Sequence, residues 1–328
     1  MSEEVRTPTM SNTLILALAP LAESAMLLEP LAARRSTNPG ERITLAGCPA
    51  LCEIAKSLGL VADAWEVAPA SDSSRSATSV IGAVSLLAKA RRGAFDLVID
   101  LFPRVASGLA SIVAAGPSAP NGNPLEGMFR SRSRAMGLVD PVSRMTQQLG
   151  VVGIDVAIPE AVDPDADVWI ERALRAIGYG GGGSVVVLHT SGAWPTERFA
   201  EVGERIRSAF GAWLVALDAP KGDRRAKLLA ARLGGSVLGV GAPTGARFLA
   251  AISRASLVVT DDQGVAHIAG LTHVPVVLVG GAETSLPGDR PDRSIVSAAS
   301  ADRVDSSAVL DAASYLLGRP RTGSLFSR

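Results

Sequence analysis

Short apolar runs alternate with longer amphipathic stretches along most of the chain. Typical runs are residues 13–19 (TLILALA), 95–101 (FDLVIDL) and 256–260 (SLVVT). Runs of this length and composition are typical of strands that are buried on both faces, and the stretches between them carry apolar residues at helical spacing. Strands that alternate with helices predict a parallel sheet with helices on both of its faces.

The alternation occurs twice along the chain. In the first series, the predicted strands are 13–19, 42–46, 64–67 and 95–101, and the predicted helices are 23–35, 49–58, 80–92, 105–114 and 140–149. In the second series, the predicted strands are 184–189, 212–218, 236–240, 256–260 and 274–279, and the predicted helices are 169–177, 196–210, 224–233, 244–255, 265–271 and 306–317.

Two series predict two domains. Residues 156–165 (VAIPEAVDPD) contain two prolines and are predicted to link them. We therefore expect an α/β protein with two Rossmann-like, doubly wound domains, at residues 13–160 and 161–328, whose parallel sheets face a cleft. Such a cleft is the usual place for a ligand. The polar residues 1–12 are predicted to form a disordered tail.

Composition excludes several classes of protein. Lysine plus arginine equals aspartate plus glutamate, at 32 each, and aromatic residues make up only 4%, so neither a basic surface nor stacking platforms point to nucleic acid. Cys48 and Cys52 lack the further ligands of a zinc site and are interpreted as two thiols in a reducing compartment. Because the chain shows no signal peptide and no membrane-spanning run, we expect it in the cytoplasm; a peripheral membrane contact stays open.

Residues 256–280 (SLVVTDDQGVAHIAGLTHVPVVLVG) carry the clearest chemical signal. They predict a strand, a polar turn, a short helix and a second strand. The free N–H groups of the first turn of a helix attract anions such as a diphosphate, and ligands collect where parallel strands end. Asp262 is predicted to cap this helix, and Asp261 is predicted to be exposed.

Three segments resemble glycosyltransferase family 9, the lipopolysaccharide heptosyltransferase type. They are residues 189–206 (HTSGAWPTERFAEVGERI), 255–270 (ASLVVTDDQGVAHIAG) and 95–116 (FDLVIDLFPRVASGLASIVAAG). The second contains an Asp-x-Gly-x-x-His pattern at Asp262, Gly264 and His267, and the first contains Trp194-Pro195. The likeness extends from about residue 13 to about residue 318, and it implies the GT-B fold.

The resemblance also implies the chemistry. A nucleotide-diphosphate sugar, with ADP as the favoured nucleotide, would bind the C-terminal domain, and a glycan or glycolipid acceptor would bind the N-terminal domain. The sugar would transfer with inversion, without a metal or other cofactor. The implied donor-binding residues are Thr190, Ser191, Trp194, Asp262, Gln263, Gly264, His267 and Glu283. Trp194 could instead be a buried anchor, and His267 could instead be a histidine within the core.

Two positions depart from the family's pattern. Where the family has a Gly-Asp pair whose aspartate is the base, this chain has Ala22 and Glu23. The resemblance implies that Glu23 is the catalytic base, and its alternative role is a carboxylate at the start of a helix. Where the family commonly has a lysine that meets the donor phosphates, this chain has Gly192.

These departures keep three functions open. The first is an active glycosyltransferase. The second is a protein that binds a sugar nucleotide but has lost catalysis. The third is another enzyme with the GT-B fold, such as a sugar-nucleotide epimerase, although the carboxylates that it would need around the sugar are not evident in the sequence. The sequence indicates no oligomeric state.

Overall fold

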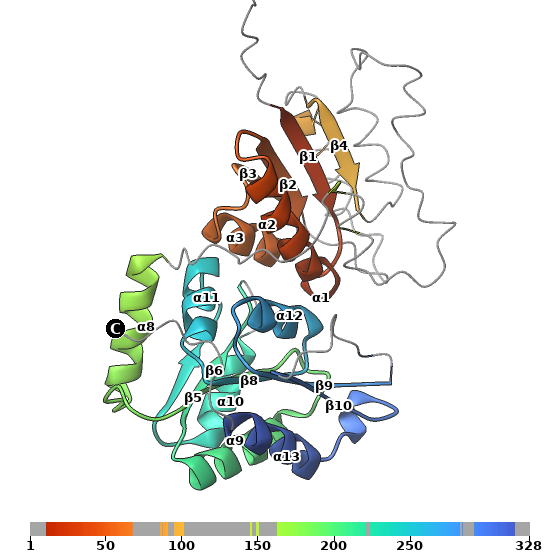
Figure 1. Cartoon of the computed structure of the whole chain (residues 1–328). Coiled ribbons are helices and arrows are strands. Elements are labelled where there is room, and N and C mark those ends of the chain that lie inside the picture. The colour runs from red at the N-terminus through yellow and green to blue at the C-terminus, as the bar shows by residue number, and fades with distance from the viewer. Residues whose placement is uncertain are drawn as a thin grey trace, which may run out of the picture. The chain divides into compact units, whose positions relative to one another are not determined.

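The computed structural model of the chain describes residues 11–67, 86, 88–90, 95–101, 145, 149–150, 163–220, 224–282, 284 and 292–318. By its internal contacts the chain divides into two compact units, with the main division between Pro159 and Glu160. The short segment Leu21–Ala25 groups with the second unit. Each unit has a sheet of its own (Figure 1).

The sheet of the first unit has four parallel strands in the order β3-β2-β1-β4. The strands are β1 (Asn12–Ala17), β2 (Arg42–Gly47), β3 (Asp63–Glu66) and β4 (Leu97–Asp100). All four were predicted to within two residues at each end. The register pairs Thr13 with Ile43 on one side and with Leu97 on the other. β1 is therefore central, and the side chains of its last five residues are all buried.

The helices of this part of the chain follow the predicted order. They are α1 (Leu21–Ser24), the 3₁₀ turn η1 (Ala25–Leu27), α2 (Leu28–Thr37) and α3 (Pro49–Ser57). The single helix predicted at 23–35 is thus split by a 3₁₀ turn. The predicted helix at 105–114 lies outside the described residues, as does most of those at 80–92 and 140–149.

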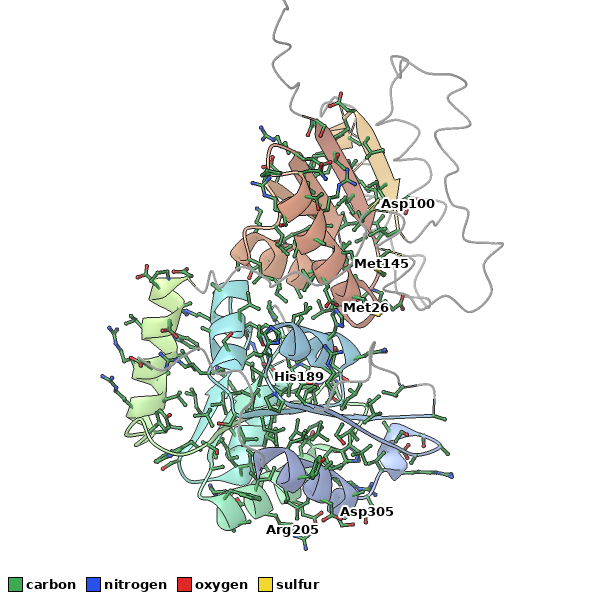
Figure 2. The ribbon with its side chains drawn as sticks, in the orientation of Figure 1. Met26, Asp100, Met145, His189, Arg205 and Asp305 are labelled. Atoms are coloured by element: carbon green, nitrogen blue, oxygen red, sulfur yellow. The ribbon has the colours of Figure 1, made fainter. Side chains whose placement is uncertain are left out.

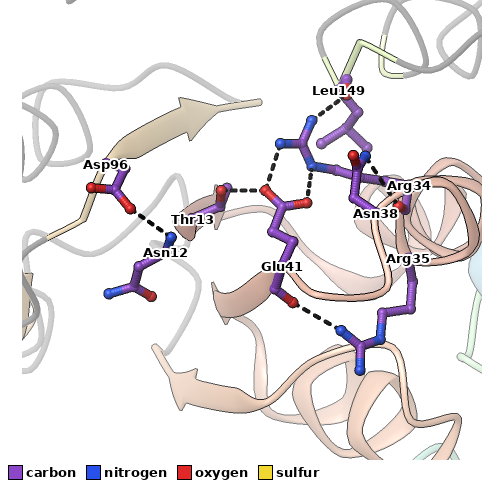
Figure 3. A network of polar contacts seen from close by, with 8 residues as sticks. All are labelled: Asn12, Thr13, Arg34, Arg35, Asn38, Glu41, Asp96 and Leu149. Carbon is purple, nitrogen blue, oxygen red and sulfur yellow. Dashed lines mark hydrogen bonds and ion pairs between the residues drawn. The ribbon is translucent and has the colours of Figure 1, made fainter. Parts of the chain in front are cut away.

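A buried ion pair joins the start of β2 to α2 (Figure 3). Glu41 is almost fully buried, and Arg34 donates to both of its carboxylate oxygens, at 2.8 and 2.6 Å. Thr13 also donates to this carboxylate, Arg35 donates to the carbonyl of Glu41, and Arg34 reaches the carbonyl of Leu149. The bidentate geometry and the extra hydrogen bonds satisfy both charges, as a buried pair requires.

The two cysteines are thiols without a disulfide, as the sequence predicts, and both are buried. Burial raises the pKa of Cys52 to about 12, and the thiol donates a hydrogen bond to the carbonyl of Gly47. At neutral pH its thiol therefore stays protonated, and a protonated thiol is neither a nucleophile nor a metal ligand.

The sheet of the second unit has six parallel strands in the order β10-β9-β8-β5-β6-β7. The strands are β5 (Val185–His189), β6 (Trp213–Leu217), β7 (Val237–Val240), β8 (Leu257–Thr260), β9 (Val276–Gly280) and β10 (Arg293–Ser297). The first five were predicted. β10 was missed because its partly exposed sequence, RSIVS, has only two strongly apolar residues and lacks the pattern of a buried strand.

Helices cover both faces of this sheet (Figure 1). They are α8 (Pro164–Ala176), α9 (Thr196–Phe210), α10 (Arg225–Leu233), α11 (Gly245–Ser253), α12 (Gln263–Leu271) and α13 (Ser306–Leu317), with a 3₁₀ turn η3 (Ala301–Arg303). Apolar side chains of α9, α10 and α13 form one core with alternate residues of the strands, such as Val186 and Leu188. α11 and α12 cover the opposite face.

α8 begins five residues earlier than predicted, inside the segment taken as the linker. The carboxylate of Asp163 accepts a hydrogen bond from the amide of Asp165, at 3.0 Å, and Pro164 occupies the first helical position. Both features favour the start of a helix. Among the helices of the described ranges, none has the length and apolar character that crossing a membrane requires.

We predict that Glu41→Ala destabilises the first unit by about 3–5 kcal/mol, because it leaves the guanidinium of Arg34 buried without its partner. Urea-dependent hydrogen exchange of peptides from β1 and β2 measures this change. Arg42→Gln is the control, since it breaks an exposed ion pair with Asp63 in the same sheet and should cost at most about 1 kcal/mol. Equal effects of the two substitutions would contradict the role of the buried pair.

Candidate functional site

The candidate site lies at the carboxyl ends of β5 and β8. These two strands are neighbours in the sheet. After β5 the chain adds β6 and β7 on one side, and after β8 it adds β9 and β10 on the other side, so the strand order reverses between β5 and β8. Loops that leave such a switch point diverge and form a ligand-binding crevice. His189 lies at the end of β5 (Figure 2). Its ring Nδ1 lies 2.9 Å from Oγ1 of Thr260 at the end of β8, and both side chains are buried.

The carboxylate of Asp261 binds the loop between β5 and α9. Oδ1 accepts the backbone N–H of Ser191, and Oδ2 accepts the N–H groups of Gly192 and Trp194, at 3.1 and 2.8 Å. The prediction that Asp261 is exposed was wrong, because only 9% of its surface is accessible. Three amide donors replace water around this charge, which is how a protein stabilises a buried carboxylate.

Asp262, the next residue, caps α12 as predicted. Its Oδ1 accepts the N–H of Val265, at 3.0 Å. Gly264 lies in the first turn of α12 and is buried, whereas Gln263 is only partly buried. Two adjacent aspartates thus have different tasks: the first holds a neighbouring loop and the second starts a helix. Direct contact of Asp262, Gln263 or Gly264 with a donor stays a prediction.

His267 lies in the second turn of α12 and has no exposed surface. A phosphate therefore reaches its ring only if neighbouring groups move. The burial of His267 agrees with the interpretation of this residue as a histidine within the core. Its role toward the donor stays a prediction.

Trp194 is an anchor for the loop rather than a stacking platform. Its side chain is fully buried, and its ring packs edge-on against Phe199, with 4.7 Å between the ring centroids. The indole N–H donates to the carbonyl of Val304, at 3.1 Å. An aromatic ring without exposed surface cannot stack on a nucleotide base. Trp194 therefore has the role of a buried anchor, which was the alternative given in the sequence analysis.

The other donor-binding candidates differ in how they are placed. Thr190 is buried, and its hydroxyl accepts the N–H of Gly192, at 3.2 Å. The side chain of Ser191 is exposed at the turn. Glu23 is exposed on α1, the segment that groups with the second unit. Glu283 lies outside the described residues.

Sequence reasoning missed the neighbour of Gly192. The backbone of Gly192 has φ = +97°, which favours glycine. A Cβ atom built at this position would lie 2.0 Å from Nη1 and 2.6 Å from Cζ of Arg225, the first residue of α10. The space that a side chain at residue 192 would enter is thus filled by a guanidinium from α10. The signal that the sequence offered was the pair Arg224-Arg225 at the start of a predicted helix.

Asp218, which follows β6, was also missed. It is buried, and its Oδ1 accepts the N–H of Ala226 in the first turn of α10, at 2.8 Å. Oδ2 has no hydrogen-bond partner within the described part of the chain. The described residues contain no group of three histidine, cysteine or acidic side chains that could hold a metal ion.

Residues 185–285 match the model of glycosyltransferase family 9 (heptosyltransferase). The matched range begins with β5 and ends just after β9, so it contains the loop that Asp261 binds and all of α12. The resemblance predicted from the sequence is confirmed over this range. A search of curated protein sequences finds no match.

Solved structures extend the likeness to nearly the whole chain. A glycosyltransferase family 9 protein from Veillonella parvula is 17% identical, with a TM-score of 0.70, 94% of this chain covered and 97% of that one. For the E. coli heptosyltransferase WaaC with ADP-2-deoxy-2-fluoro heptose, the values are 17%, 0.67, 92% and 98%. For UDP-GlcNAc 2-epimerase from Methanocaldococcus jannaschii, they are 14%, 0.53, 95% and 94%. At these identities the likeness establishes the fold, which is GT-B as predicted.

We predict that Asp261→Asn loosens the loop of residues 191–194. An asparagine has one acceptor oxygen in place of two charged ones, so at least one of the three amides would face an N–H₂ group. The free energy for opening this loop should fall by about 2–3 kcal/mol, as measured by amide hydrogen exchange of Ser191, Gly192 and Trp194.

Asp262→Asn is the matched control, because asparagine caps a helix about as well as aspartate. It should change the exchange of the loop amides by less than about 0.5 kcal/mol. Unchanged protection in Asp261→Asn would show that this carboxylate does not hold the loop.

Proposed function

We propose that this chain is a glycosyltransferase that transfers a sugar, with inversion, from a nucleotide-diphosphate sugar to a glycan or glycolipid acceptor. The observation that carries the proposal is the family match over residues 185–285, since this range includes the loop bound by Asp261 and the start of α12. Both lie at the carboxyl edge of a parallel sheet, where ligands of this architecture bind.

An ADP-linked sugar of the heptose type is the donor that we favour. The support is the structural likeness to WaaC, whose solved structure includes an ADP-heptose analogue. A diphosphate at the start of α12 would lie at the positive end of the helix, which stabilises the charge that develops as the leaving group departs. The proposal therefore includes no metal ion.

We assign Glu23 the role of the general base. Its carboxylate would take the proton from an acceptor hydroxyl while the hydroxyl oxygen attacks the anomeric carbon and the bond to the diphosphate breaks. The exposure of Glu23 leaves its carboxylate accessible to a substrate. The proposed acceptor is of the lipopolysaccharide type, with the enzyme in the cytoplasm or at the inner membrane surface.

A second candidate is a protein that binds the same sugar nucleotide without catalysis. The pair Ala22 and Glu23, in place of Gly-Asp, is the observation that favours it, because proton transfer depends on the placement of the carboxylate and glutamate is one methylene longer. An epimerase of the GT-B fold has only the fold in its favour.

We predict that Glu23→Gln abolishes sugar transfer and leaves the Kd for the donor nearly unchanged, because the amide keeps the shape of the side chain but cannot accept a proton. Transfer is measured with a panel of nucleotide sugars and envelope glycan acceptors, and donor binding by calorimetry. Loss of a general base typically slows the reaction about 10²- to 10⁴-fold.

Glu29→Gln, the same change in the first turn of α2, is the control and should keep full activity. Normal turnover of Glu23→Gln would remove Glu23 as the base. Donor binding by the native protein without turnover on any acceptor would favour the second candidate.

A further inference from the structure

We propose that Arg225 binds the diphosphate of the donor and thereby supplies the positive charge that residue 192 lacks. The inference rests on the proposed function, because it concerns the same nucleotide site. It goes further because it assigns the binding of the diphosphate to Arg225, beside a position, Gly192, that has no side chain for this task.

The first argument is the position of the guanidinium. Arg225 begins α10, directly after Arg224, whose φ of 63° turns the chain into the helix. A Cβ on Gly192 would meet Nη1, Cζ and Nη2 of Arg225 at 2.0, 2.6 and 3.0 Å. The flat group therefore lies against the backbone of the loop between β5 and α9, which is the loop that leaves the switch point.

The second argument is that Gly192 and Arg225 depend on each other. Any side chain at position 192 would occupy the space of the guanidinium, and the φ of +97° would strain it as well. A lysine at position 192 and Arg225 in this place are therefore alternatives. Either residue would place a positive charge beside this loop. The lysine would belong to the loop itself, whereas Arg225 belongs to α10.

The third argument is that three amide donors of the loop are already bound to a carboxylate. The N–H groups of Ser191, Gly192 and Trp194 all point to the carboxylate of Asp261. The carboxylate of Asp262 at the start of α12 adds a second negative charge at this edge. A cation beside these two carboxylates favours the binding of a diphosphate, and the planar fork of arginine donates two parallel hydrogen bonds to phosphate oxygens.

A fourth observation points to a ligand beside the same turn. The carboxylate of Asp218 binds the N–H of Ala226, the residue after Arg225, and so occupies the start of α10 itself. Its Oδ2 is buried and has no partner among the described residues. This oxygen can accept a hydroxyl hydrogen, so a ligand with phosphates near Arg225 and hydroxyl groups near Asp218 would complement both side chains.

The test compares nucleoside diphosphates with monophosphates. Calorimetry with ADP, AMP, UDP and UMP gives the Kd of each for the native chain, Arg225→Gln and the control Arg232→Gln. Arg232 lies at the other end of α10 in an exposed ion pair with Glu197, so its loss changes the net charge equally.

We expect Arg225→Gln to weaken the binding of the better-binding diphosphate roughly 10- to 100-fold. Its preference over the monophosphate should shrink, and Arg232→Gln should stay near the native values.

Gly192→Ala provides a second variant that keeps the arginine in the chain but pushes its guanidinium away. Gly192→Ala should also reduce the preference for the nucleoside diphosphate over the monophosphate. The proposal can therefore be tested even if Arg225→Gln does not fold. A merely structural role of Arg225 would weaken diphosphates and monophosphates alike.

An unchanged preference in both variants, with nucleotides still bound, overturns the assignment of Arg225 and leaves the proposed function standing. If the native chain binds none of the four nucleotides, both fall together.

Discussion

The carboxylate of Asp261 is the group on which the arrangement of the site depends. Residue 261 follows β8, and the amides that it accepts follow β5, some 70 residues earlier in the chain. By joining the ends of two neighbouring strands across the switch point, it gives the loop of residues 191–194 one conformation. The buried ring of Trp194, held by Phe199 and the carbonyl of Val304, fixes the other end of that loop. This loop in turn presents Gly192 to Arg225.

This arrangement shows how a chain can depart from a motif of glycosyltransferase family 9, which it resembles over residues 185–285, and still place a cation beside the same loop. A glycine in place of lysine indicates lost function when the sequence is considered position by position. In three dimensions the same glycine makes room for a guanidinium from α10. Arginine presents a planar fork and cannot be deprotonated in a protein, so the exchange would preserve positive charge and change the geometry of phosphate binding. The departure at Gly192 is therefore weaker evidence for lost catalysis than the pair at Ala22 and Glu23.

Much of the fold was accessible from the sequence because parallel strands buried on both faces have an unmistakable composition. β5, β8 and β9 were predicted for this reason, and Asp262 was predicted as a cap because capping is a local interaction. The features that were not accessible include the burial of Asp261, the contact of Arg225 with Gly192 and the edge strand β10. The first two join residues that are far apart in the chain, and β10 lacks the apolar run that marks a central strand. The roles of Glu23 and His267 toward a substrate stay predictions.

The central claim is that the donor diphosphate lies against Arg225 while Asp261 remains bound to its loop. A crystal structure of the chain with its best-binding nucleoside diphosphate tests this most directly. The account predicts phosphate oxygens about 3 Å from the guanidinium of Arg225, with Asp261 still accepting the amides of Ser191, Gly192 and Trp194. A diphosphate that displaces Asp261 from those amides, or that lies away from Arg225, would contradict it.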